Sequence, residues 1–165
     1  SGTTVTRVAD TSSTTGLSSV IGQTEGTLQF KFEKSKIIED YAVISLMSTG
    51  TDAIMIGTRN LSPANDSLRL LFYKANVLTL NVTLAANIGS GNFNVAVAYK
   101  LNDWSVFVNG VEVYTNTSVA APSSLSDLRL LNRFGTAYNF SYPLENLSLY
   151  KTRLDNATLA TLTTI

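Results

Sequence analysis

One stretch of the chain, NFNVAVAYKLNDWSVFVNGVEVYTNTS at residues 92–118, alternates apolar and polar residues on both sides of an Asn-Gly pair. Asn109 and Gly110 fit a type I′ turn, because both central positions of that turn need positive φ. Upstream, Val and Ala alternate over residues 95–98, which predicts a strand with little polar surface on either face. A short turn at 101–103 separates that strand from the hairpin. The stretch therefore predicts three successive antiparallel strands, a β-meander.

The rest of the chain repeats this kind of signal. In the run TLQFKFE, Leu28, Phe30 and Phe32 point to one face and the polar residues between them to the other. Gly, Asn, Asp, Ser and Pro gather between the runs, as turns require. The fold class predicted is all-β, with two antiparallel sheets packed face to face in one domain over 1–165, excised from a longer chain. The further strands are expected at 27–33, 41–48, 53–59, 67–74, 77–84, 127–132 and 144–152.

One helical signal closes the chain, in RLDNATLATL at 153–162. Asp155 is placed to cap a short helix, and Leu154 before it is placed to pack on Leu159 as a hydrophobic staple. Leu159 and Leu162 are three residues apart and would share the buried face. We expect this helix to seal an open edge of the sandwich.

Composition excludes several classes of function. The 165 residues include no Cys and no His, and the formal net charge is zero. Without these two residue types there is no disulfide, no thiolate or imidazole metal site, and no Ser-His-Asp triad. The lack of a basic cluster argues against nucleic acid as a partner, because Lys and Arg supply most of that affinity. No apolar run reaches the roughly 20 residues of a membrane-spanning helix, so membrane insertion is not expected.

Longer motifs resemble a known family. The succession VAVAYKLNDWSVFVNGVEV, Pro122 with SSLSDLRLLN, and PLENLSLYKTRLDNATLATLT is similar to the concanavalin A-like, laminin-G-like domains of bacteriophage tail-fibre and other virion proteins. The opening TRVADTSSTTGLSSVIGQTEGTLQF resembles the start of the same domains. This resemblance implies a jelly-roll sandwich of the lectin/glucanase type with a short C-terminal helix. It also implies a place on the surface of a virus particle, often with carbohydrate binding at a host surface.

Catalysis is not expected from the carboxylates. Glycoside hydrolysis needs two carboxylates that flank the scissile bond, about 5 to 9 Å apart. Laminarinase-type relatives of this fold carry them in an E-x-D-x-E pattern on one strand, and the chain has no such pattern. The adjacent Glu39 and Asp40 would point to opposite faces of a strand. The sequence therefore predicts that the domain is not an enzyme.

Binding a sugar needs an aromatic face and nearby amide, carboxylate or guanidinium groups. Trp104 follows two polar residues, although on its strand it shares a face with Val106 and Val108, which is typical of a core residue. A long loop at 132–142 combines aromatic, Asn and Arg side chains, and such loops often carry binding; some of its aromatics also have to cover the core edge. The candidate carbohydrate-binding residues are Asn102, Asp103, Trp104, Arg133, Phe134, Tyr138, Asn139 and Tyr142.

A metal site is the third candidate. The turn RNLSPAND at 59–66 is rich in oxygen ligands, and Asn65 and Asp66 could hold Ca²⁺ there. The same residues also suit a plain hairpin loop, and that interpretation is the simpler one.

Two hypotheses follow. The first is a non-enzymatic carbohydrate-binding or host-attachment module of a phage virion, in a tail fibre or associated with the capsid, with a host-surface glycan and other virion subunits as partners. The second is a structural or decoration domain that mediates protein–protein assembly in the virion and binds no sugar. A homo-oligomer fits either, since fibre proteins are commonly trimeric, although no heptad repeat indicates a coiled coil.

Overall fold

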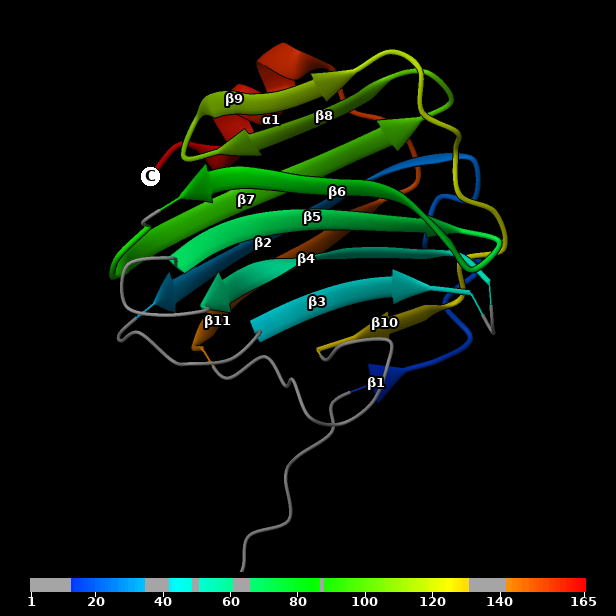
Figure 1. Cartoon of the computed structure of the whole chain (residues 1–165), viewed down its shortest axis with the longest axis horizontal. Coiled ribbons are helices and arrows are strands. Elements are labelled where there is room, and N and C mark those ends of the chain that lie inside the picture. The colour runs from blue at the N-terminus through cyan, green and yellow to red at the C-terminus, as the bar shows by residue number, and fades with distance from the viewer. Residues whose placement is uncertain (1–12, 35–41, 49–50, 61–65, 87, 131–141) are drawn as a thin grey trace, which may run out of the picture.

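The computed structural model describes residues 13–34, 42–48, 51–60, 66–86, 88–130 and 142–165. They form a sandwich of two antiparallel sheets with one short helix (Figure 1). The two-sheet antiparallel sandwich predicted from the sequence is confirmed.

The six-stranded sheet faces the viewer in Figure 1 and has the order β1-β10-β3-β4-β5-β6. Its long central strands are consecutive in the chain and pair with one another, whereas β10 joins from far along the sequence. The strands predicted here are confirmed to within one or two residues where the structure describes them, except that β10 is shorter than expected. The bounds are β1 Ser13–Thr14, β3 Ala42–Met47, β4 Ala53–Asn60, β5 Asp66–Lys74, β6 Val77–Ala86 and β10 Asp127–Arg129.

The five-stranded sheet lies behind it, with the order β11-β2-β7-β8-β9. The predicted meander is its β7-β8-β9 half. Asn109 and Gly110 have φ values of 50° and 81°, so the turn between β8 and β9 needs positive φ at both positions, as expected. The bounds are β2 Glu25–Lys34, β7 Gly91–Lys100, β8 Trp104–Val108, β9 Val111–Asn116 and β11 Leu144–Tyr150.

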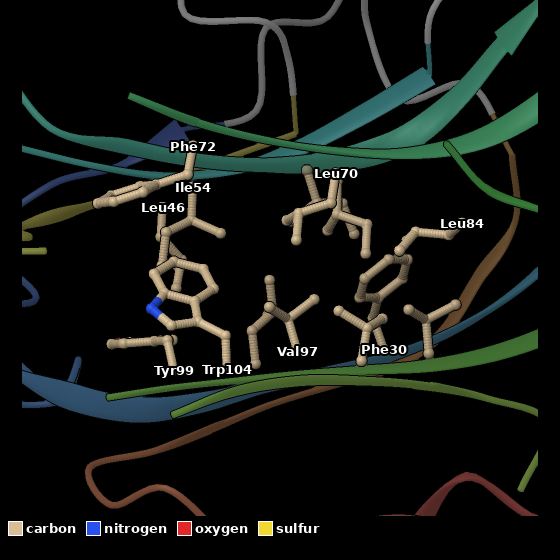
Figure 2. Close-up of a cluster of buried hydrophobic side chains, with 14 of the residues drawn as sticks. Phe30, Leu46, Ile54, Leu70, Phe72, Leu84, Val97, Tyr99 and Trp104 are labelled. Carbon is tan, nitrogen blue, oxygen red and sulfur yellow. The ribbon is translucent and has the colours of Figure 1, made fainter. Parts of the chain in front are cut away.

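Alternate residues of both sheets fill the space between them (Figure 2). Leu70 and Phe72 enter this core from the six-stranded sheet, and Phe30, Val97 and Trp104 meet them from the other. All five side chains are completely buried. Burial of apolar side chains such as these is the main favourable contribution to folding. The chain has no cysteine, so no disulfide adds to it.

The helix α1, Asn156–Thr163, begins as predicted at Asp155. The Asp155 carboxylate accepts hydrogen bonds from the backbone N–H of Thr158 at 2.8 Å and from its hydroxyl at 2.9 Å, and these bonds lower the pKa of Asp155. Leu154 and Leu159 belong to the same apolar cluster, as the staple requires. Leu159 is buried, whereas Leu162 is only half-buried and Thr163 takes the second buried position.

The position of α1 corrects one expectation. Leu159 packs on Ala96, Ala98 and Phe107, which project from the outer face of β7 and β8. The helix therefore covers an outer face of the five-stranded sheet rather than sealing an edge, because the small alanines on β7 leave room for it. Among the described residues, none of the helices combines the length and apolar character needed to cross a membrane.

A buried carboxylate ties together the turns at one end of the sandwich. Asp52 is 3% exposed and accepts hydrogen bonds from the Lys74 ammonium at 2.8 Å, from the Ala75 N–H at 2.9 Å and from the Ser123 N–H at 2.7 Å. Burial by itself raises the pKa of Asp52, but the bonds from Ala75, Lys74 and Ser123 together outweigh it and lower the pKa below the ordinary 3.8.

This network predicts acid-dependent stability. Because the folded-state pKa of Asp52 is depressed, its contribution is present above the unfolded value of 3.8 and is lost as the pH falls through the folded value. We expect Asp52→Asn to lower the free energy of unfolding by about 2 kcal/mol near neutral pH. Urea unfolding of both proteins as a function of pH should show the difference shrinking in acid. A difference that stays constant down to strongly acidic pH would contradict this role.

Candidate functional site

The structure places Trp104 in the core, which is the interpretation favoured by its sharing a face of the strand with Val106 and Val108. Its side chain is completely buried and its ring centroid lies 4.8 Å from that of Phe72 and 5.8 Å from that of Tyr99 (Figure 2). Its indole N–H donates to the carbonyl oxygen of Ala120 at 3.1 Å. The prediction that Trp104 stacks on a sugar is therefore corrected, because its ring is enclosed between the two sheets.

The two residues before Trp104 form the turn between β7 and β8. Asn102 is exposed, and its φ of 56° suits the turn. The Asp103 carboxylate pairs with the Arg153 guanidinium at 2.8 Å, and Arg153 also donates to the Ser105 hydroxyl at 2.9 Å. This arrangement anchors the chain between β11 and α1 to the meander, which is a structural role.

Most of the predicted binding loop lies outside the described residues, including Arg133, Phe134, Tyr138 and Asn139. Tyr142, at its end, is 5% exposed and its ring centroid lies 5.7 Å from that of Phe32. Burial first, and then the nearby Asp66 charge, raise the pKa of Tyr142, while a hydrogen bond with Thr58 opposes them. The assignment of Tyr142 to a sugar site is therefore corrected: it closes the end of the core.

The predicted candidates also lie at two different ends of the sandwich. Tyr99, which touches Trp104, is beside Gly26 in the strand register, whereas Phe32, which touches Tyr142, is six residues further along β2. Six residues of strand correspond to about 20 Å. The structure therefore does not bring Trp104 and Tyr142 together in one site.

The metal prediction is corrected at Asp66, while Asn65 lies outside the described residues. Asp66 points into the sandwich from β5 and forms an ion pair with Lys34 of β2, so the pair joins the two sheets. The Lys34 ammonium also donates to the carbonyl oxygen of Gly89 at 2.5 Å. Lysine supplies the positive charge that Ca²⁺ would have supplied. Within the described part of the chain, no group of three or more acidic residues is placed to hold a metal ion.

The outer faces of the two sheets differ. Helix α1 and the polar residues around it occupy the outer face of the five-stranded sheet, where Gln29 is buried and bonded to Asn94 at 2.6 Å. Among the described elements, none packs on the outer face of the six-stranded sheet. This face of β10-β3-β4-β5-β6 is called the arginine face below, after Arg69 and Arg129.

The strand register defines what lies on the arginine face. One row across the sheet runs from Arg129 of β10 through Ser45, Met55 and Leu71 to Asn81 of β6. The next rows place Arg69 beside Gly57 and Thr83, and Tyr73 beside Ala53 and Leu78. Arg69, Leu71 and Tyr73 are half-buried, while Asn81 and Thr83 are exposed.

The floor of this face is apolar and its polar groups stand above it. Met55 is 2% exposed, and Leu71 and Tyr73 pack against the cluster that it forms with Met47 and Ala53. The guanidinium of Arg69 donates to the amide oxygen of Asn81 on the neighbouring strand. An aromatic ring, an amide and a guanidinium thus lie on one surface, which is the set of groups a sugar-binding site needs.

Most of the acidic residues that the structure describes are engaged by cationic side chains. Six of the described carboxylates are committed to ion pairs, with Lys31, Lys34, Lys74, Lys100, Arg129 and Arg153. Among the described residues of the arginine face, the acidic one is Asp127, whose carboxylate binds the Arg129 guanidinium at 2.8 Å. Glycoside hydrolysis needs two carboxylates that flank the scissile bond, and the described part of this face supplies one.

A shallow depression of about 370 Å³ lies on the surface of α1, lined by Ala157, Thr158, Thr161 and Leu162. It is widely open to solvent and has neither an aromatic ring nor a charged group in its lining. These residues offer methyl groups and two hydroxyls, which is poor chemistry for recognising a sugar. The arginine face is therefore the better candidate site.

The fold and the open sheet face define a lectin-like jelly-roll sandwich, and the comparisons with solved structures agree. The chain is similar to the Ruminococcus gnavus IT-sialidase CBM40, with a TM-score of 0.67 and 16% identity over 89% of this chain and 86% of that one. It is also similar to domain 4 of AbnA, a GH43 extracellular arabinanase from Geobacillus stearothermophilus, in complex with arabinotriose, with a TM-score of 0.65 and 13% identity over 88% and 69%.

A third similar structure is the heptameric SAP-like pentraxin from Limulus polyphemus, with a TM-score of 0.63 and 12% identity over 88% of this chain and 72% of that one. At these identities the likeness establishes the fold. No protein-family profile and no curated protein sequence matches the chain.

Sequence reasoning did not select the residues of the arginine face. Arg69, Tyr73 and Asn81 lie in runs that were assigned only as strands, and Arg129 lies in the predicted strand after Pro122. The available signal was the alternation of Ser67, Arg69 and Tyr73 with apolar residues in SLRLLFYK, which marks an outward face, although Leu71 at the remaining outward position is itself apolar. Only the strand order, which places β10 in the same sheet as β5 and β6, shows that Arg129 lies on the same face as Arg69, Tyr73 and Asn81.

Proposed function

We propose that this domain is a non-enzymatic carbohydrate-binding module and that sugar binds on the arginine face. The observation that carries the proposal is the composition of that face: Tyr73, Arg69 and Asn81 stand on adjacent strands above an apolar floor, and no described element covers them. A tyrosine ring stacks on the apolar side of a pyranose, while amide and guanidinium groups bond to its hydroxyls.

The structural neighbours support this proposal. The R. gnavus CBM40 has been solved bound to α2,3 and α2,6 sialyllactose, and the arabinanase domain in complex with arabinotriose. The fold of this chain is therefore one on which oligosaccharides bind in other proteins. Attachment of a virion to a host-surface glycan is the more specific form of the proposal and rests on the resemblance to phage domains.

Substitutions on the two sheets test this proposal. Tyr73→Ala and Asn81→Ala should each weaken glycan binding about tenfold, since loss of stacking or of a hydrogen bond costs about 1.4 kcal/mol. Tyr150→Ala is the matched control, because Tyr150 is a half-buried tyrosine on β11 of the opposite sheet. A glycan array followed by titration calorimetry, with circular dichroism to check folding, gives the measurement. Equal binding by all three variants would exclude the arginine face.

The alternative, a structural module for assembly, is favoured by a different observation. The edge strand β6 exposes Val77 and Leu78, at 66% and 42%, and edge strands readily pair with other chains. If the array shows no glycan bound while the domain associates in sedimentation experiments, and Val77→Lys abolishes that association, the assembly function replaces the carbohydrate one.

A further inference from the structure

We infer that the arginine face selects acidic glycans, whose carboxylates bind to Arg69 and Arg129. This inference rests on the proposed carbohydrate function and names the class of sugar that the face recognises. Its basis is the hydrogen-bonding state of the two guanidinium groups, their spacing across the sheet and the charge balance around them.

Arg69 has unused donor capacity. One of its terminal nitrogens bonds to the Asn81 amide, while its Nε–H is buried and has no hydrogen-bond partner within the described part of the chain. A buried donor without a partner is unfavourable in the unliganded protein. A carboxylate accepts two parallel bonds from a guanidinium fork, and arginine suits that planar geometry better than lysine does.

Arg129 is in the same state on the other side of the face. Its terminal Nη2 bonds to Asp127 at 2.8 Å, and its buried Nε–H likewise lacks a partner among the described residues. Its side chain is 31% exposed, so it reaches solvent. Asp127 also accepts a bond from the Ser126 hydroxyl at 2.9 Å, which holds this carboxylate, and with it the guanidinium, in place.

The spacing of the two arginines fits a chain of sugars. Arg129 lies on β10 and Arg69 on β5, with β3 and β4 between them. Three steps between strands correspond to about 14 Å. The intervening strands present the small Ser45 and Gly57 beside Met55, and all three are buried, so the floor between the arginines is low. An oligosaccharide that lies across the strands can contact both guanidinium groups.

The charge balance favours an anion. Arg69 and Arg129 carry two positive charges on this face and Asp127 carries one negative charge, which leaves an excess of one positive charge among these three residues. Local positive charge attracts acidic ligands and is screened by salt. A neutral sugar gains nothing from this excess.

The experiment compares ligands that differ only in charge. Oligogalacturonate is titrated against its methyl ester, and α2,3-sialyllactose against the methyl ester of its sialic acid carboxyl group, by calorimetry at low and high salt. We expect at least one acid to bind at least tenfold more tightly than its neutral counterpart, and added salt to reduce that preference. Arg69→Gln and Arg129→Gln should each reduce acid binding about tenfold, and Arg69→Lys should recover it only in part. Lys100→Gln removes one charge from an exposed side chain outside this face and should have no effect.

The outcomes separate the two levels of the proposal. The acidic preference is overturned if each acid binds no more tightly than its neutral counterpart, or if both Arg→Gln variants bind the acid as tightly as the original protein does. In either case, glycan binding that is weakened by Tyr73→Ala would still support the carbohydrate function. If no glycan of the array and neither acid binds to the folded protein, both are overturned.

Discussion

Lys34→Met is expected to lower the free energy of unfolding by about 3–5 kcal/mol, because it leaves the Asp66 carboxylate buried without its counter-charge. Lys34 and Asp66 side chains are 1% and 3% exposed, and they join β2 of one sheet to β5 of the other. One carboxylate oxygen of Asp66 has no hydrogen-bond partner among the described residues, so within that part of the chain the lysine supplies most of the compensation for burying the charge.

The double variant Lys34→Met with Asp66→Leu distinguishes a buried pair from two independent residues. Replacing both charges with apolar groups of similar size removes the desolvation cost together with the attraction, so stability near or above that of the original protein is expected. Urea unfolding followed by circular dichroism measures the original protein, Lys34→Met, Asp66→Leu and the double variant. If the losses of the two single variants simply add in the double variant, Lys34 and Asp66 do not compensate each other.

Trp104→Ala is expected to cost a similar amount, about 3–5 kcal/mol, because it opens a cavity between the sheets. The indole is completely buried, contacts Phe72 and Tyr99, and donates a hydrogen bond to Ala120. Trp104→Phe retains much of the volume and loses the N–H, so a smaller loss of about 1–2 kcal/mol should follow.

The same variants decide between a core and a binding role for Trp104. A core role requires the unfolding midpoint to fall while the folded protein keeps its affinity for a bound glycan. If Trp104→Ala left stability unchanged and reduced glycan affinity instead, the indole would have to be accessible to ligand, contrary to the structure. Because Trp104 is the single tryptophan, unfolding of the alanine variant has to be followed by circular dichroism rather than fluorescence.

The two outer faces of the sandwich differ in the described elements that cover them. Helix α1 packs on the alanines of β7 and so occupies the outer face of the five-stranded sheet. The arginine face of the other sheet carries Tyr73, Arg69 and Asn81 above an apolar floor, and in our proposal these groups bind sugar. A rigid sheet under the site would hold such groups in place without a large ordering cost on binding.

The sequence by itself determined the local elements of this protein. The alternation of apolar and polar residues located the strands, the Asn109-Gly110 pair specified the β8–β9 turn, and Asp155 specified the start of α1. Each of these features depends on residues within a few positions of one another. The all-β class and the sandwich followed from the number and spacing of those strands.

Only the tertiary structure decided which residues meet. Trp104 and Asp66 were candidate ligands for a sugar and a metal, each beside a simpler structural interpretation, and the structure places both side chains in the interior, where Trp104 contacts Phe72 and Asp66 pairs with Lys34. Arg69 and Arg129 are 60 positions apart in the sequence numbering, and the insertion of β10 beside β3 brings them to one face. Alternation assigns a residue to one of two faces, but the partner strand, which depends on long-range packing, determines its neighbours.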